Sequence, residues 1–149
     1  MFSTTPNRYP EQLIAHMRTD LTQYGVKEAR TAEEVNQLLT PGSGTVLMVV
    51  NSVCGCAAGK ARPAVGLALR HSTRPDAVAT VFAGADIEAV NQVRQLLPGI
   101  PPSSPSMALF QDGKPVFVVH RYQIESSDPH GIAELLTAAF DQYCATAKQ

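Results

Sequence analysis

Two cysteines separated by one glycine, Cys54 and Cys56, are the residues whose types and spacing point most directly to chemistry. They follow an apolar run that ends at Asn51, and a helix is expected to begin near Ala57. The start of a helix has unpaired N–H groups and the positive end of the helix dipole, and both favour a negative charge. A cysteine thiolate is such a charge and is the reactive form of the residue. The pattern therefore predicts a reactive dithiol at a strand-to-helix junction.

The single residue between the cysteines also limits the disulfide that they can form. A disulfide needs closely approaching Cα atoms and a defined torsion, and a ring closed between residues i and i+2 meets these needs only with strain. Gly55 supplies the conformational freedom that such a ring requires. Because a strained disulfide is easily reduced, we expect a good oxidant or isomerase when oxidised, and mostly a dithiol in cells.

Two other interpretations of the pair remain open from the residues alone. Cysteine is often buried as a small apolar residue, so both thiols would then be ordinary core side chains. A structural zinc site needs four ligands with paired spacings. The other cysteine is Cys144, and no histidine has a partner at metal-ligand spacing, so we predict no metal site. The histidines are His16, His71, His120 and His130.

Polar residues on both sides of the cysteines are candidates for shaping the site. Lys60 and Arg62 follow the pair, and would raise its thiolate content or hold an anionic ligand unless they belong to a solvated helix face. Asn51 and Ser52 precede it, and would hydrogen-bond near the site or cap the helix. We retain Asn51 and Arg62, together with Gly55, as site-shaping residues.

Three further residues have no assigned relation to the cysteine pair. Cys144 ends a predicted helix, where a half-buried bystander is favoured over a third redox thiol. His120 and Arg121 follow the last predicted strand. Nothing in the sequence says whether these two side chains face the cysteines.

The composition indicates one globular domain, residues 1–149. Hydrophobic residues make up 44% of the chain and charged residues 17%, as expected for a folded protein. The formal net charge of −1 gives no excess of basic residues of the kind that binds nucleic acid, and no polybasic patch for a membrane. We find no signal peptide and no membrane-length apolar run, so we expect a cytoplasmic protein. Thiols stay mostly reduced there, which disfavours a structural bridge.

Hydrophobic periodicity predicts alternating helices and strands over most of the chain. An apolar, β-branched run at 45–51 is typical of a strand buried on both faces. Thr31 and Glu34 form a capping box at the start of the second helix. After the cysteines we predict a helix from about Ala57 that is kinked by Pro63; the alternative is an irregular loop with Pro63 at the first helical position. The other expected elements are helices at 10–24, 87–97 and 130–146, an edge strand at 26–30 and a strand within 76–86.

A hairpin before the last helix completes the predicted fold. Two apolar strands flank Asp112-Gly113, which is a strong hairpin signal. Alternating helices and strands imply right-handed crossovers and a parallel core, to which the hairpin adds antiparallel strands. The expected fold class is α/β, with a central mixed sheet flanked by helices and an extra N-terminal helix.

The residues before the hairpin resemble a thioredoxin-fold pattern. Pro105 lies just before a strand that turns at Asp-Gly, and in that fold a cis proline at this place faces the reactive cysteine. The resemblance implies a thioredoxin-like fold, a cis Ser104–Pro105 bond and a substrate-binding role for Pro105. The competing interpretation is a plain loop proline, since most X-Pro bonds are trans. The chain differs from thioredoxin itself by its C-x-C motif and its lack of Trp.

Four segments read together resemble the bacilliredoxin family, which consists of thioredoxin-like proteins with a C-G-C motif. They are NSVCGCAAGKARP, SPSMALFQDGKPV, HRYQIE and LTAAFDQYC. The resemblance spans nearly the whole chain, and the block from C-G-C-A to A-R-P is its most specific part. It implies reduction of mixed disulfides between proteins and bacillithiol, a small thiol that carries glucosamine and malate.

The same resemblance implies roles and partners. Cys54 is the nucleophile and Cys56 the candidate resolving thiol. The expected partners are bacillithiolated or disulfide-containing proteins and the low-molecular-weight thiol, which serves as co-substrate; no metal or organic cofactor is implied. A general disulfide isomerase or reductase is the alternative within this class. A non-catalytic thiol module that binds or carries metal is the alternative from another class.

Overall fold

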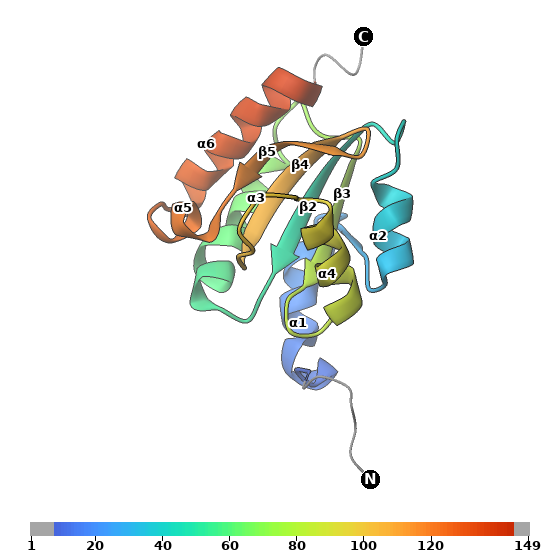
Figure 1. The fold of residues 1–149 in the computed structure, drawn as a ribbon. Helices are drawn as coiled ribbons and strands as arrows, with labels where there is room; N and C mark the ends of the chain where they lie inside the picture. Colours follow the sequence, from blue (N-terminus) through green and yellow to red (C-terminus); the bar gives the residue numbers. More distant parts are fainter. Residues whose placement is uncertain (1–7, 145–149) are drawn as a thin grey trace.

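One mixed sheet of five strands forms the centre of the computed structural model, which describes residues 8–144 (Figure 1). The strands are β1 (Lys27–Glu28), β2 (Thr45–Asn51), β3 (Ala77–Phe82), β4 (Ser106–Gln111) and β5 (Lys114–Val119). Their order across the sheet is β1-β3-β2-β4-β5. β1 and β2 pair with β3 in parallel, whereas β4 is antiparallel to β2 and to β5. The predicted parallel core, edge strand and hairpin are confirmed.

Helices cover both faces of this sheet. Those on one face are α2 (Ala32–Leu38) and α4 (Ile87–Gln95), and those on the other are α3 (Arg62–Ala68) and α6 (Pro129–Ala139) (Figure 1). The N-terminal helix α1 (Glu11–Thr22) adds Leu21 to the α3 and α6 side. Within residues 8–144, no helix is long and apolar enough to cross a membrane.

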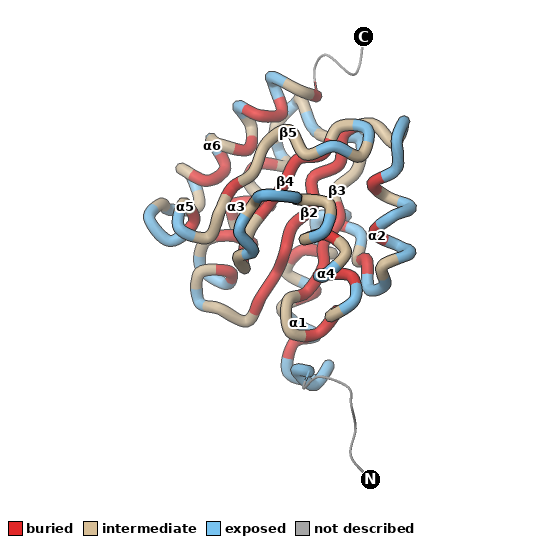
Figure 2. The backbone as a smooth tube through the Cα atoms, in the orientation of Figure 1, coloured by how far each residue is buried: buried red, intermediate tan, exposed pale blue. Residues whose placement is uncertain are grey.

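The central strand β2 is buried along its whole length because helices cover both of its faces. Successive side chains of a strand point to opposite faces. Leu47 and Val49 accordingly pack with α3 and α6, whereas Val46, Met48 and Val50 pack with α2 and α4. Figure 2 shows the buried backbone concentrated in the sheet and on the inward sides of the helices. The doubly buried strand predicted from the apolar run is confirmed.

The hairpin and the loop before it also have the predicted backbone. Asp112 and Gly113 have φ values of 51° and 83°, the left-handed conformation at both central positions that a two-residue hairpin turn favours. The Ser104–Pro105 bond is cis. Both features match the pattern from which the fold was predicted.

The helix that follows the cysteines contains a π turn. It begins at Gly55 and continues through η1 (Ala57–Ala61) into α3. The N–H of Arg62 donates to the carbonyl of Ala57, five residues earlier, so this turn is wider than an α-turn. Pro63 follows at once and has no N–H to offer. The irregularity predicted near Pro63 is thus a π turn inside one helix, and the alternative of a loop ending at Pro63 is wrong.

The C-terminal part contains one helix that periodicity does not reveal. α5 (Arg121–Glu125) follows β5 directly, and its five residues are too few for a recognisable periodic pattern. The last predicted helix begins at Pro129 and continues from α6 through η2 (Phe140–Cys144). Positions 145–146 of that prediction lie outside the described residues.

α1 is fixed to the sheet by a buried arginine that its apolar pattern does not anticipate. Arg18 donates two hydrogen bonds to Asp86, at 2.8 and 2.9 Å, and two to Glu11, at 2.8 and 3.2 Å. Its guanidinium also lies over the ring of Phe82. Burial lowers the pKa of Arg18, but the two carboxylates outweigh it and raise that pKa above its ordinary value. Leu13, an apolar residue of this predicted helix, is exposed.

Replacing Arg18 with Met is expected to lower the free energy of unfolding by about 3–5 kcal/mol, because the Asp86 carboxylate stays buried without its partner. Urea denaturation followed by circular dichroism measures the loss. Arg30→Met is the matched control, since Arg30 pairs with Glu28 but is 47% exposed. Its removal should cost under about 1 kcal/mol. Equal losses for the two variants would contradict the structural role of Arg18.

Candidate active site

Three chain segments meet beside Cys54, and the register of the sheet explains why. β2 leads to Cys54, and its last residues pair with the start of β4, which Pro105 precedes. The start of β4 also pairs with the end of β5, after which His120 and Arg121 follow. The cysteine loop, the proline loop and the start of α5 are therefore neighbours at one edge of the sheet.

The sulfur of Cys54 receives hydrogen bonds from two N–H donors. The backbone N–H of Cys56 lies 3.4 Å from Sγ, and Nη2 of Arg121 lies 3.3 Å from it. The N–H of Cys56 is the main cause that lowers the pKa of Cys54 below its ordinary value, and the Cys56 thiol and the Arg121 charge contribute. Partial burial opposes them without cancelling the effect. Cys54 is thus the thiol that ionises first.

Cys56 has the opposite tendency. Partial burial raises the pKa of Cys56, and the neighbouring Cys54 sulfur and the charge of Glu125 raise it further. Its side chain packs against the core around α3 and α6. Both thiols are half-buried, so they are not fully buried core residues, and exposure alone does not distinguish them. Their charge environments do, and favour Cys54 as the nucleophile.

Arg121 is held in place by contacts with two other segments. Its Nη1 donates to the carbonyl of Ser104 at 3.1 Å, and its Nε lies 3.5 Å from the Glu125 carboxylate. Its backbone N–H donates to Oγ of Ser103 at 3.3 Å. Because these serines precede the cis Pro105, Arg121 connects the reactive sulfur to the proline loop.

Sequence patterns did not assign Arg121 to the thiols, yet one signal places it near them. A hairpin with a two-residue turn fixes its own register, so residues after β5 must lie beside residues before β4. With the cysteines following the adjacent β2, this register brings Arg121 to the same edge. It does not give the direction of the side chain.

Asn51 and Arg62, which were expected to shape the site, share a contact with α1. Nδ2 of Asn51 and Nη1 of Arg62 both donate to the carbonyl of Met17, at 3.1 and 3.3 Å. Arg62 is only 3% exposed, and its Nε lies 3.5 Å from the Asp20 carboxylate. Burial lowers the pKa of Arg62, and the charge of Asp20 opposes this. These contacts fix the end of β2 against α1, whereas the cation that reaches the Cys54 sulfur is Arg121.

Three other residues near the pair have distinct surroundings. Oγ of Ser52 accepts a hydrogen bond from the N–H of Cys54 at 3.2 Å. Gly55 is exposed, and a Cβ built on it would meet nothing within 4 Å, so crowding does not require glycine in the dithiol form. Its role in closing the small disulfide ring stays a prediction. Lys60 donates to the carbonyl of Glu125 at 2.6 Å, at the end of α5.

Two hollows flank Arg121. The one beside Cys54 has a volume of about 320 Å³ and is lined by Tyr9 and Ser52 as well as by Arg121. The other has a volume of about 500 Å³ and lies along Pro102 and Tyr122. Only the first contains the reactive sulfur.

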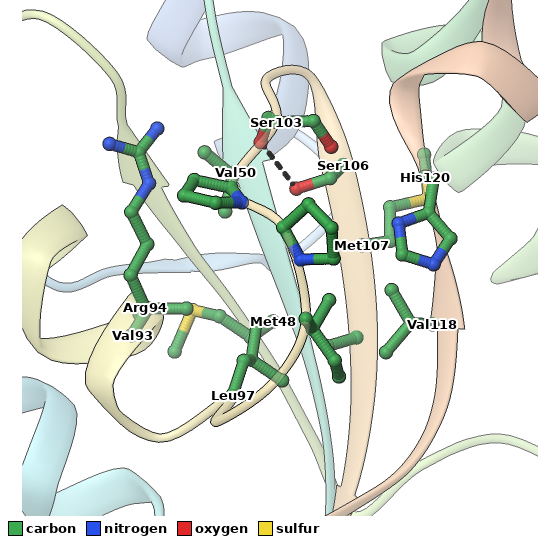
Figure 3. A pocket seen from close by; sticks show the side chains of 14 residues that line it. Met48, Val50, Val93, Arg94, Leu97, Ser103, Ser106, Met107, Val118 and His120 are labelled. Carbon is green, nitrogen blue, oxygen red and sulfur yellow. Dashed lines mark hydrogen bonds between the residues drawn. The ribbon is translucent and has the colours of Figure 1, made fainter.

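Figure 3 shows a third hollow, a crevice behind the proline loop. Mainly apolar side chains line it, and at its edge Oγ of Ser106 donates to the carbonyl of Ser103 at 2.9 Å. Its free volume of about 20 Å³ is little more than a water molecule needs. Cys54 does not line this crevice, so we assign the chemistry to the pocket beside the thiol.

The third cysteine lies elsewhere. Cys144 is fully buried in the core that includes α3 and α6, and it does not line the pocket beside Cys54. Among residues 8–144, no group of three or more His, Cys, Asp or Glu side chains is arranged to hold a metal ion.

Residues 9–144 match the model of a protein family described as disulphide isomerase. A bacilliredoxin of Salinibacter ruber is 51% identical over 138 residues, which is 91% of this chain and 81% of that protein. A bacilliredoxin of Koribacter versatilis is 48% identical over 140 residues, 93% of this chain and 97% of that protein. This chain belongs to the bacilliredoxin family. The resemblance drawn from the C-G-C segment is therefore confirmed.

Solved structures support the fold to which bacilliredoxins were expected to belong. The thioredoxin of Malassezia sympodialis superposes with a TM-score of 0.55 at 20% identity, covering 80% of this chain and 90% of that one. The thioredoxin-like fold is confirmed. Family and fold together indicate a thiol–disulfide oxidoreductase whose partners are disulfide-containing proteins or thiols.

Limited alkylation is expected to label Cys54 before Cys56. With scarce iodoacetamide near pH 7, the thiol with the lower pKa carries the larger thiolate fraction and reacts first. The labelling rate of Cys54 should fall with decreasing pH only as the pH passes through its lowered pKa, below the ordinary value of about 8.5. Peptide mass spectrometry locates the label, and preferential labelling of Cys56 would reverse the assignment.

Replacing Arg121 with Met is expected to raise the pKa of Cys54, because the thiolate loses a charged hydrogen bond. The alkylation rate at pH 7 should then drop at least about threefold, and its pH profile should move to higher pH. Arg121→Lys keeps the positive charge but lacks the several fixed N–H donors of the guanidinium, so it should give an intermediate pH profile. Arg70→Met removes an exposed cation from the turn after α3 and serves as the charge control. A profile unchanged by Arg121→Met would remove the assigned role.

Proposed function

We propose that this protein removes bacillithiol from mixed disulfides on client proteins. The Cys54 thiolate attacks the bacillithiol sulfur, the client sulfur leaves as a thiolate and takes up a proton, and a Cys54–bacillithiol disulfide forms. Free bacillithiol then attacks the bacillithiol sulfur of this adduct, which forms bacillithiol disulfide and releases the Cys54 thiolate. In the alternative route Cys56 attacks the Cys54 sulfur, which releases bacillithiol and leaves a Cys54–Cys56 disulfide that external thiol reduces. Each step breaks one S–S bond and forms another, and thiol supplies the reducing equivalents. No metal or organic cofactor takes part.

The observation that carries the proposal is the pair of donors on the Cys54 sulfur. A nucleophile in thiol–disulfide exchange must be a thiolate at working pH, and a pKa near that pH gives the best balance of ionisation and reactivity. The N–H of Cys56 and the guanidinium of Arg121 supply that stabilisation from fixed positions. The relatives named bacilliredoxin support bacillithiol as the small thiol.

The charges around Cys56 favour its use in the second step. Burial raises the pKa of Cys56, and while Cys54 is a free thiolate its sulfur raises that pKa further. Formation of the mixed disulfide removes the negative charge from Cys54. Burial still raises the pKa of Cys56 in the adduct, but the contribution of the Cys54 charge has gone. The resolving thiol is therefore easier to ionise after the first step than before it.

An anionic co-substrate suits the cation of this site. Bacillithiol carries the two carboxylates of malate, and Arg121 loses its thiolate partner once Cys54 enters a disulfide. The guanidinium can then pair with a carboxylate in the bidentate geometry that these groups share. A hydrogen bond to a charged group is worth on the order of 1.5–3 kcal/mol, or roughly a ten- to hundredfold preference.

A general disulfide isomerase or reductase is the second candidate, and the description of the matching family model favours it. Such an enzyme needs the same low-pKa thiol but no site for a small thiol. Repair of scrambled ribonuclease measures this activity.

A non-catalytic metal carrier is the alternative from another class, and it is tested by metal analysis of protein purified without added metal. Stoichiometric zinc, iron or copper that disappears in Cys54→Ser would favour it.

Cys56→Ala is expected to accept bacillithiol onto Cys54 and to retain it as a mixed disulfide, because the internal resolving thiol is absent. The variant is incubated with a bacillithiolated protein, and intact-mass spectrometry follows both partners. Cys54→Ser is the matched control and should gain no adduct. An adduct on Cys56 in wild-type protein, or none on Cys54 in the variant, would contradict the assigned order of attack.

The wild-type protein is expected to act faster on a bacillithiolated client than on the same client carrying glutathione. Glutathione is an anion of a different shape, and Arg121 is expected to fit the malate carboxylates of bacillithiol. The client thiol released in each reaction is counted at matched concentrations. Equal rates on both adducts, with scrambled ribonuclease repaired as quickly, would replace the specific function with the general isomerase.

A further inference from the structure

Tyr9 supplies the aromatic side chain of the pocket beside Cys54. It precedes α1, which the sequence pattern treated only as an additional helix. Its side chain is 40% exposed, although it lies in a pocket that contains a reactive sulfur. The exchange steps proposed for the two cysteines make no use of it. An aromatic side chain kept open beside the nucleophile is therefore a candidate for ligand binding.

The position of Tyr9 is fixed by the loop after β3. Its backbone N–H donates to the carbonyl of Gly84 at 3.1 Å. Its ring lies so close to Gly84 that a Cβ at that position would collide with it. Gly84 also has a φ of 85°, which glycine adopts without strain. The loop thus leaves room for the ring and holds its backbone at the same time.

The buried ion pair described above locks together the two segments that meet at Tyr9. Arg18 belongs to α1, which begins two residues after Tyr9, and its bidentate partner Asp86 lies two residues after Gly84. Movement of the N-terminal segment away from the loop would break this pair at a high cost, because both groups are buried. The ring of Tyr9 is therefore held at the pocket before any ligand binds.

We infer that Tyr9 is a specificity-determining residue whose ring binds the non-sulfur part of the low-molecular-weight thiol, an inference that rests on the proposed function. Once the thiol is joined to Cys54, its polar body occupies the pocket between Tyr9 and Arg121. Arg121 pairs with its carboxylate, and the ring of Tyr9 covers its apolar face. The client polypeptide stays outside this pocket.

The size and chemistry of the pocket support a small ligand. Sites for small molecules have volumes of about 300–1,000 Å³ and combine apolar surface with a few fixed polar groups. The pocket has about 320 Å³ and offers an arginine, serine hydroxyls and one aromatic ring. Tyrosine suits a polar ligand that also has apolar C–H surface, because the tyrosine side chain has an apolar ring and a polar hydroxyl.

The test compares two kinds of substrate in Tyr9→Ala. One kind is a single-cysteine client carrying bacillithiol or glutathione, and the other is a protein with an ordinary internal disulfide. Loss of an aromatic contact is expected to raise KM about threefold to tenfold for the small-thiol adduct. We expect kcat to stay within twofold, and the rate on the internal disulfide to be unchanged.

Two further variants separate binding from structure. Tyr9→Phe keeps the ring and should restore KM to within twofold of the wild type. Tyr122→Ala is the matched control, since Tyr122 is an exposed tyrosine on the other hollow beside Arg121. It should leave KM for the small-thiol adduct unchanged. Thermal melting of each variant checks that the fold is intact.

The trapped Cys54–bacillithiol adduct of Cys56→Ala gives a direct readout. Its amide NMR spectrum should show shifts at Tyr9 and Gly84 relative to the unmodified variant, and none at Tyr122. This measurement does not depend on turnover. Shifts confined to the Tyr122 side would place the small thiol in the other hollow and overturn the inference.

The outcomes separate this inference from the proposed function. Turnover of the glutathione adduct without turnover of the bacillithiol adduct would end the proposed function. The role of Tyr9 would then be judged from the KM of Tyr9→Ala for the glutathione adduct. Turnover of neither adduct would end both. Equal effects of Tyr9→Ala on small-thiol and internal disulfides, or no effect on either, would end the assignment of Tyr9 alone.

Discussion

The contact between the Arg121 guanidinium and the Cys54 sulfur is the interaction on which the rest of the site depends. A half-buried thiolate needs compensation for lost hydration, and one N–H at the start of a helix gives only part of it. Arg121 adds a full charge and also binds the carbonyl of Ser104 before the cis proline. The nucleophile, the proline loop and the cation therefore form one connected unit rather than three separate features.

Much of this arrangement is readable from the sequence because it follows from local chemistry. The apolar run of β2 requires cover on both faces, and Asp112-Gly113 fits only a tight hairpin turn. A pair of cysteines after a buried strand and before a helix predicts reactivity on electrostatic grounds alone. The resemblance to the thioredoxin-fold pattern then named the cis bond, and the resemblance to bacilliredoxins named the expected nucleophile; residue patterns by themselves left both open.

The parts that sequence did not reveal depend on contacts between distant segments. Arg62 and Arg121 are both basic residues near a motif or a strand end, and only the packed structure shows that one is buried against α1 and the other reaches the sulfur. Arg18 similarly interrupts an apolar helix face because Asp86 lies opposite it in space. Side-chain direction and long-range pairing, not element type, were the missing information.

The helix that carries Arg121 is only five residues long, and isolated helices of that length are not stable in water. Its last carbonyl is instead held by Lys60, from the helix that follows the cysteines. Arg121 follows the cysteines by more than sixty residues, so a chain that ends before α5 lacks the Arg121 contribution to the Cys54 thiolate. Full stabilisation of the sulfur in this way requires both the helix that follows the cysteines and the C-terminal part of the chain.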